Sequence, residues 1–236
     1  MFLKDISFET PIKNLLYDDV LLHIADKIKP QEYLRFWESP EPFVVLGRIS
    51  NKEEDVNFET TAQDGVEVFR RSSGGGTVLQ GPGCLNFSFI LDKTKRRELN
   101  DLKQSYSYIL NKVIEGLSVG GVEAKLMPIS DIALMNNKKI SGNAQKRGRN
   151  FVLHHGTIMY DFNLDNIARY LGMPKDMPNY RDARTHLDFV ANINMTCDTI
   201  KKNIIKSFDE SLKVSKITAE EEGFLQDFVQ SNKITV

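Results

Sequence analysis

The apolar residues of segment 12–27 recur every three or four positions, a spacing that predicts an amphipathic helix. The same helical spacing returns at residues 103–117. Three more helices are expected toward the C-terminal end, at residues 164–172, 197–212 and 219–232. Helices therefore dominate both ends of the chain.

Strands dominate the middle, where short apolar runs are bounded by glycine, proline or asparagine. The predicted strands are residues 32–39, 42–49, 66–71 and 85–91, followed by several within 124–162 that turn at 136–137 and 148–150. A proline-containing turn at residues 40–42 joins the first two. Residues 51–65 have turn residues at both ends and predict a surface helix.

This order of elements favours an α+β fold, a mixed β-sheet flanked by helices, over a regular alternation of strand and helix. A chain of 236 residues suits one large domain or two small ones. Because no repeat, low-complexity linker or composition boundary interrupts the pattern, we predict a single domain over residues 1–236.

Charge and cysteine content narrow the classes of function. The 31 basic and 32 acidic residues give a net charge of −1, so the chain has no overall field that attracts nucleic acid or a membrane surface. No segment approaches the roughly 20 apolar residues of a membrane span, and the first ten residues lack a secretory signal. Two cysteines, Cys84 and Cys197, do not make a disulfide framework, which favours a reducing, cytoplasmic location.

The first motif is the run Arg-Arg-Ser-Ser-Gly-Gly-Gly-Thr at residues 70–77. It lacks the Lys-Ser/Thr ending of a phosphate P-loop and the spacing of a dinucleotide-binding loop. Three glycines without side chains let backbone N–H groups approach a ligand closely. Strand alternation places Arg70 and Arg71 on opposite faces, so one of them can reach an anion beside the glycines. A glycine-rich hairpin with solvated arginines is the alternative.

The second motif lies within residues 136–162 and combines a lysine, a Ser-Gly pair and a His-His-Gly-Thr run. Alternation along a strand sends His154 and His155 to opposite faces, so the pair is a poor metal chelate. Cys84 lies within a hydrophobic strand and is expected to be a small buried core thiol. Cys197 is expected at the start of a helix, as an ordinary first-turn residue.

With both motifs in view, the chain resembles the lipoate–protein ligase A family, part of the superfamily of biotin/lipoate ligases and octanoyltransferases. The resemblance covers most of the chain, and the family's catalytic domain has the mixed sheet flanked by helices that the pattern predicts. It is carried by NLLYDDVLL, PFVVLGRISN, RRSSGGGTV, SDIAL, KKISGNAQ and LHHGTIMYDFNLDNIARYL, in that order.

The resemblance implies an ATP-dependent ligase that uses Mg²⁺ to convert lipoate to lipoyl-adenylate and pyrophosphate. The lipoyl group then passes to one lysine of a carrier domain, without a permanently bound cofactor. The implied partners are acyltransferase subunits of 2-oxoacid dehydrogenases and the glycine-cleavage H protein.

The resemblance also implies roles for individual residues. Lys139 corresponds to the catalytic lysine on the reacting carbonyl and phosphate oxygens, and Asp131 to the acidic position near the metal. The implied contacts to lipoate and adenylate are Arg70, Ser73, Gly74, Gly75, Gly76, Thr77, Ser141, Gly142, His155, Gly156 and Thr157.

Departures from the family pattern leave three functions open. Gln80-Gly81 stands where many of the ligases have His-Asp, and the chain is shorter than ligases with a C-terminal accessory domain. A ligase without the accessory domain either needs a separate accessory protein for adenylation or works alone with a capping loop. The alternatives are a transferase that moves octanoyl or lipoyl groups between carriers without ATP, and a non-catalytic protein that binds acyl groups or carriers. The two positions that hold a nucleophilic cysteine in the transferases, within residues 127–131 and 169–175, hold none here.

Overall fold

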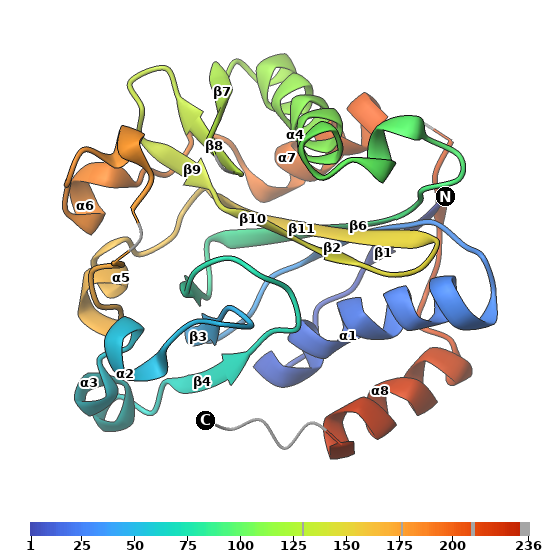
Figure 1. Cartoon of the computed structure of the whole chain (residues 1–236), viewed down its shortest axis with the longest axis horizontal. Coiled ribbons are helices and arrows are strands. Elements are labelled where there is room, and N and C mark those ends of the chain that lie inside the picture. Colours follow the sequence, from blue (N-terminus) through green and yellow to red (C-terminus); the bar gives the residue numbers. More distant parts are fainter. Residues whose placement is uncertain (129, 176, 209–210, 232–236) are drawn as a thin grey trace.

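The centre of the computed structural model is a six-stranded mixed sheet with the strand order β10-β11-β6-β2-β1-β12 (Figure 1). The structure describes residues 1–128, 130–175, 177–208 and 211–231. The strands are β1 (Phe2–Asp5), β2 (Tyr33–Trp37), β6 (Cys84–Asp92), β10 (Asn143–Arg147), β11 (Phe151–Met159) and β12 (Lys213–Val214). Strand β1 runs parallel to both of its neighbours, and the other pairs are antiparallel.

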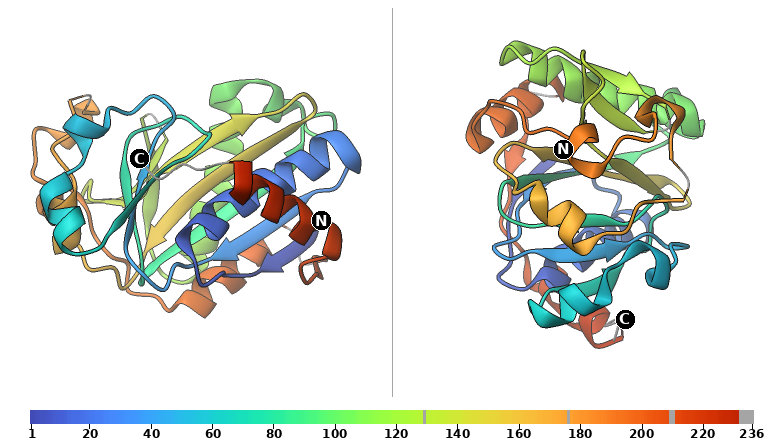
Figure 2. Two further views of the ribbon diagram at one scale, coloured as in Figure 1. Left: turned by 90° about the horizontal axis from the view of Figure 1, so that it is seen from below. Right: turned by 90° about the vertical axis from the view of Figure 1, so that its left-hand side faces the viewer.

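Helices cover both faces of this sheet, as Figures 1 and 2 show from different sides. Helix α1 (Pro11–His23) packs on one face, and α8 (Ala219–Ser231) packs on the outside of α1. Helices α4 (Leu102–Val119) and α7 (Cys197–Phe208) pack together on the opposite face. The predicted α+β fold with a mixed, helix-flanked sheet is confirmed.

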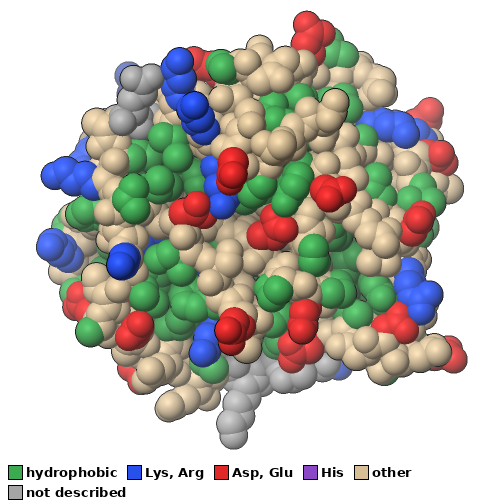
Figure 3. Space-filling view, turned by 180° about the vertical axis from the view of Figure 1, so that it is seen from behind, with side chains coloured by type: hydrophobic (Ala, Val, Ile, Leu, Met, Phe, Trp, Pro, Cys, Tyr) green, Lys and Arg blue, Asp and Glu red, His purple; other side chains and the backbone are tan. Residues whose placement is uncertain are grey.

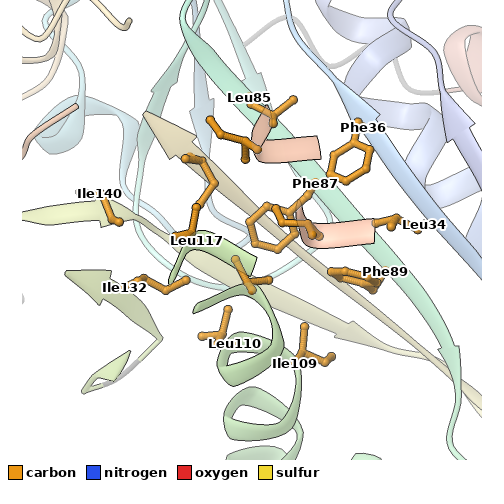
Figure 4. Packing of buried hydrophobic residues seen from close by; sticks show 14 of the residues in the cluster. Leu34, Phe36, Leu85, Phe87, Phe89, Ile109, Leu110, Leu117, Ile132 and Ile140 are labelled. Atoms are coloured by element: carbon orange, nitrogen blue, oxygen red, sulfur yellow. The ribbon is translucent and has the colours of Figure 1, made fainter. Parts of the chain in front are cut away.

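The main hydrophobic core lies between the sheet and the α4–α7 layer (Figure 4). Phe87 and Phe89 of β6 meet Ile109 and Leu110 of α4 there, and all four are completely buried. Every residue of β6 is buried, because helices cover both of its faces. Full burial of one such side chain contributes about 1.5–3 kcal/mol, so this layer fixes the strands that carry the site.

Two three-stranded sheets flank one end of the main sheet (Figure 1). One has the order β4-β3-β5 and the other β7-β8-β9. Their strands are β3 (Phe43–Leu46), β4 (Glu67–Arg70), β5 (Val78–Gln80), β7 (Ala124–Met127), β8 (Asp131–Leu134) and β9 (Lys139–Ser141). The glycine motif therefore connects β4 to β5, whereas the lysine motif begins at β9. Strands β2 and β3, which follow one another in sequence, belong to different sheets.

A buried polar network joins α1 to the sheet. Arg35 of β2 is completely buried, and its Nη1 donates to Asp18 Oδ1 of α1 over 2.7 Å. Ser88 of β6 donates to the other carboxylate oxygen of Asp18 over 2.6 Å. The Arg35 guanidinium also lies over the ring of Tyr17, 4.8 Å from its centroid. These contacts satisfy a charged pair in a region that water does not reach.

Most predicted elements are confirmed, including α1, α4, α7, α8 and α5 (Asp165–Tyr170). The remaining helical segments are short: η1 (Ile24–Ile28), η2 (Arg97–Asn100), η3 (Asn179–Arg181) and α6 (His186–Phe189). Residues 209, 210 and 232 of the predicted helices lie outside the described residues.

The single helix predicted over residues 51–65 is wrong. The segment forms two helices, α2 (Lys52–Asp55) and α3 (Phe58–Gln63). Between them Val56 is buried and pairs with Leu171 as an isolated antiparallel bridge. Asn57 then starts α3, because its side chain accepts a hydrogen bond from Thr60 N. A tertiary contact thus interrupts the helix.

The surface carries both signs of charge. Figure 3 shows the face opposite to that of Figure 1, where basic and acidic side chains both occur and apolar side chains are scattered between them. Among the described residues, no helix combines the length and apolar character needed to cross a membrane.

Candidate functional site

The buried Arg71 side chain holds the glycine motif in a tight turn. Its Nη2 donates to the carbonyls of Gly74 and Gly76, each over 2.7 Å, and its Nε donates to Ser73 Oγ over 3.1 Å. Burial lowers the pKa of Arg71 to about 10, which leaves the guanidinium charged at neutral pH. The arginine that contacts the glycines in this structure is therefore Arg71.

Two serines of the motif tie the turn to the rest of the domain. Ser73 Oγ lies 2.6 Å from His155 Nε2 on β11. Ser72 Oγ donates to Asp19 of α1 over 2.7 Å, and the same carboxylate accepts from Lys146 of β10 over 2.9 Å. The glycine turn is thus fixed between α1 and the edge of the main sheet.

The glycines leave space on one side of the turn and close it on the other. A Cβ atom added at Gly74 or Gly76 would meet no atom within 4 Å. Gly75 has a φ of +85°, a conformation that favours glycine, and a Cβ there would lie 2.9 Å from Arg71 Nη2. Gly47 faces this turn, because a Cβ at Gly47 would overlap the carbonyl oxygen of Gly75. Bare backbone is therefore open to a ligand at Gly74 and Gly76.

The side chains at the two ends of the motif contact the protein. Arg70 Nη1 donates to the carbonyls of Gly47 and Ser50, over 2.7 and 2.9 Å. Thr77 Oγ1 donates to Asp55 Oδ2 over 2.6 Å. Contacts of Arg70 and Thr77 with a ligand stay predictions.

Lys139 and Asp131 form an ion pair across strands β8 and β9. Lys139 Nζ lies 2.9 Å from Asp131 Oδ1, and the lysine side chain is 25% exposed. The missing side chain of Gly142 makes room for it, since a Cβ there would lie 3.1 Å from Lys139 Nζ. Tyr180 donates to the other oxygen, Asp131 Oδ2, over 2.6 Å. Burial, reinforced by the Asp131 charge, raises the pKa of Tyr180, so this hydroxyl keeps the proton that it donates.

The Ser-Gly pair and Gly156 are built around a buried asparagine. Asn143 Nδ2 donates to Ser141 Oγ over 2.9 Å and to the Ser130 carbonyl over 2.8 Å. Any Cβ at Gly156 would overlap the Asn143 side chain. This network fixes the bend between β9, the strand that begins with Lys139, and β10.

Strand β11 brings the two motifs together. His155 lies beside the glycine turn, and Thr157 N donates to the Gly142 carbonyl over 3.2 Å. Residues two apart on a strand point to the same face, about 7 Å apart. The glycine turn therefore contacts β11 at His155. Gly142, over which the Lys139 side chain extends, contacts the same strand two residues further on, at Thr157.

The paired histidines lie on opposite faces of β11, as alternation predicts. His155 faces the glycine turn, whereas His154 packs against the rings of Phe87 and Tyr106 and bonds through Nδ1 to Gln145. Burial lowers the pKa of His155 to about 4 and that of His154 to about 3. Both imidazoles are therefore neutral at pH 7.

Acidification should destabilise the fold through His154. An unfolded histidine has a pKa of about 6.5, so between pH 6.5 and 3 the unfolded state binds a proton that buried His154 does not. The free energy of unfolding should therefore fall as pH decreases, by about 2 kcal/mol from this residue between pH 7 and pH 5. Urea unfolding at both pH values should show a smaller loss for His154→Phe, which keeps a ring but cannot titrate. Equal losses in the two proteins would refute this.

Neither cysteine is placed as an activated nucleophile. Cys84 is 2% exposed, as predicted for a core thiol, and burial raises its pKa to about 12. Cys197 does open helix α7, and burial raises its pKa as well. Both thiols therefore stay protonated at neutral pH.

Four residues with structural roles at this site have no role in the sequence prediction: Arg71, Asp19, Asn143 and Tyr180. Asp19 and Tyr180 lie far from both motifs in sequence, so no spacing connects them to the site. Asn143 directly follows Ser141-Gly142, so a polar residue next to a glycine between two strands is the sequence signal that could have identified it.

Comparison with known proteins defines the family. The model of the lipoyl protein ligase A/B catalytic domain matches residues 10–209. The chain belongs to this family. It is 30% identical over 212 residues to the lipoate-protein ligase LplJ of Bacillus subtilis, covering 87% of this chain and 61% of LplJ. The family inferred from the two motifs is thus confirmed.

Solved structures of the family share this fold. A lipoate-protein ligase A crystallised with ATP superposes with a TM-score of 0.83 at 22% identity, over 97% of this chain and 94% of that one. A chain from the bipartite lipoate protein ligase and E2 lipoyl domain of Thermoplasma acidophilum gives 0.79 at 22% identity, over 97% and 91%. At this identity the likeness establishes the fold of the lipoyl ligase domain and no more.

Proposed function

We propose that the chain is the catalytic part of a lipoate–protein ligase and that residues 1–236 act as one domain. In the first half-reaction the carboxylate of lipoate attacks the α-phosphorus of ATP, which releases pyrophosphate and leaves lipoyl-adenylate. In the second, the ε-amine of a carrier lysine attacks the acyl carbonyl, which releases AMP and leaves an amide. ATP and lipoate are substrates here, and no cofactor remains bound between turnovers.

The observation that carries this proposal is the Lys139 ammonium, which is partly exposed over Gly142. Gly142 bonds to Thr157 of β11, two residues from the His155 that contacts the glycine turn. Both half-reactions build negative charge on phosphoryl or carbonyl oxygens. A preorganised positive donor at such an oxygen contributes about 3 kcal/mol to lowering the barrier. Asp131 keeps the ammonium in place before the substrate arrives.

The glycine turn and β11 are proposed to bind lipoate and adenylate. Gly74 and Gly76 offer backbone against which a phosphate or acyl chain can lie without side-chain obstruction. The proposed contacts to lipoate and adenylate also include Ser73, Gly75, Thr77, Ser141, Gly142, His155, Gly156, Thr157 and Arg70. Neutral His155, anchored to Ser73, suits contact with an uncharged acyl chain.

Mg²⁺ fits this site as a partner of the nucleotide. Proteins usually bind Mg²⁺ through one or two carboxylates together with substrate phosphates and water. Among the described residues, no three histidine, cysteine or acidic side chains converge, which suits a metal held mainly by substrate phosphates. Asp131, the acidic residue beside Lys139, would be its carboxylate ligand. Each oxygen of Asp131 accepts one hydrogen bond, and a carboxylate has about four lone-pair sites in all. When bound, the metal would neutralise charge on the phosphates.

The proposed partners are lipoyl carrier domains, such as those of 2-oxoacid dehydrogenase acyltransferase subunits or the glycine-cleavage H protein. The solved Thermoplasma system that resembles this chain comprises a bipartite ligase and an E2 lipoyl domain, which supports a carrier of this kind. Because that ligase is bipartite, a separate accessory protein is the alternative to activation by the chain itself. The free cysteines Cys84 and Cys197 suit a cytoplasmic location.

Two assays test the function. Purified chain should release pyrophosphate from ATP only when lipoate and Mg²⁺ are both present, and a lipoyl domain should then gain the mass of one lipoyl group. Lipoylation from supplied lipoyl-adenylate alone would mean that an accessory protein performs the activation. Acyl transfer from an octanoylated carrier without ATP, with an acyl adduct on Cys84 or Cys197, would establish the transferase instead. Binding without either reaction would leave the non-catalytic alternative.

A further inference from the structure

One segment, residues 177–191, holds Lys139 at two points. Ala191 N donates to the Lys139 carbonyl over 2.9 Å, and Val190 pairs with Lys139 as an isolated parallel bridge. The second contact is indirect and runs through side chains. The Tyr180 hydroxyl donates to Asp131 Oδ2 over 2.6 Å, and Asp131 Oδ1 lies 2.9 Å from Lys139 Nζ. Figure 1 shows the end of this segment, helix α6, beside β9.

Tyr180 is itself fixed by contacts inside the segment. Arg184 Nη2 donates to the Tyr180 carbonyl over 2.8 Å, and the Tyr180 ring packs on Phe189 at a centroid distance of 5.2 Å. The guanidinium groups of Arg181 and Arg184 lie 4.7 and 5.2 Å from the same Phe189 ring. Arg181 and Arg184 also donate to each other's carbonyls. The hydroxyl therefore reaches Asp131 from a preorganised side chain.

We propose that Tyr180 is a positioning residue for Lys139 in the ligase reaction, acting through Asp131. This inference rests on the proposed function. A carboxylate held at one oxygen can still rotate about its bond to Cβ. A second hydrogen bond at the other oxygen fixes its plane, and with it the direction of the lysine ammonium over Gly142. Tyr180 thereby joins segment 177–191 to the charge that acts on the reacting oxygens.

The kinetic test uses Tyr180→Phe, which removes only the hydroxyl. The kcat of lipoate-dependent pyrophosphate release should fall about tenfold, the effect of losing one hydrogen bond to a charged group. The KM values for lipoate and ATP should stay within about twofold, because the hydroxyl acts on the lysine and not on substrate. Tyr170→Phe is the matched control, since Tyr170 OH donates to Asp64 Oδ2 over 2.9 Å at the contact of α3 with α5. It should leave kcat unchanged.

A second measurement needs no turnover. At one fixed pH, an amine-acylating reagent should modify Lys139 faster in Tyr180→Phe than in the wild type or in Tyr170→Phe, as read from peptide masses, because Asp131, the ion-pair partner of Lys139, is then held at one oxygen only. Unchanged labelling of Lys139, or an unchanged kcat in an active protein, would overturn the positioning role. If the wild type neither releases pyrophosphate nor transfers the lipoyl group from supplied lipoyl-adenylate, the proposed function fails by its own assays, and labelling still decides whether Tyr180 fixes Lys139.

Discussion

Lys139→Ala should lower the rate of lipoate-dependent pyrophosphate release by at least about a hundredfold. The ammonium is the positive group that the structure places over Gly142, and a preorganised donor of this kind is worth about 3 kcal/mol in the transition state. The fold should persist, because the contact of the Lys139 carbonyl with Ala191 does not depend on the side chain. Pyrophosphate release and the melting temperature, measured on the same preparation, check both statements.

The neighbouring lysine supplies the control for this prediction. Lys138→Ala removes an equal charge one residue away and should leave the rate almost unchanged. Transfer from supplied lipoyl-adenylate to a lipoyl domain should be impaired in Lys139→Ala as well, since the acyl carbonyl also gains negative charge. If Lys139→Ala keeps more than about a tenth of the wild-type rate, an effect of only 1.4 kcal/mol, Lys139 is not the catalytic lysine.

The sequence predicts the fold well where periodicity reports burial directly. Helix α4 and strand β6 are found at the positions expected, because one has a clear apolar stripe and the other is a continuous apolar run. It fails at residues 51–65, where the pairing of Val56 with Leu171 divides the expected helix. That contact joins residues more than a hundred positions apart, and local spacing carries no record of it.

The candidate site divides in the same way. Motifs locate Lys139, Asp131 and the glycine turn, because the residues within each motif are close to one another in sequence. The family resemblance points to Arg70 as the arginine that contacts lipoate or adenylate, whereas the arginine that contacts the glycines in the structure is Arg71. Tyr180 is brought to Asp131 by tertiary folding of residues 177–191, so this contact is visible only in the folded structure. Local pattern thus identifies the candidate charged groups, and the three-dimensional structure shows which side chains contact them.

Asp18→Ala should be among the most destabilising substitutions in the chain, with a loss of about 3–5 kcal/mol. Arg35 is completely buried and Asp18 is 3% exposed, so the variant leaves a guanidinium without its counter-charge where water cannot replace it. Ser88 loses its acceptor at the same time. A typical domain has a free energy of unfolding of about 5–15 kcal/mol, so this loss would be a large share of it. Urea unfolding of both proteins measures it.

Two comparisons separate the buried charge from simple truncation. Glu115→Ala breaks the exposed ion pair with Lys112, 3.0 Å apart on α4, and should cost less than about 1 kcal/mol. The double variant Asp18→Leu with Arg35→Met removes both charges and should recover much of the stability lost in Asp18→Ala, because no unpaired ion remains. If the double variant is less stable than Asp18→Ala, the two charges contribute through their other hydrogen bonds. Asn14 would then be the residue to test, since Arg35 donates both to its carbonyl and to its side chain.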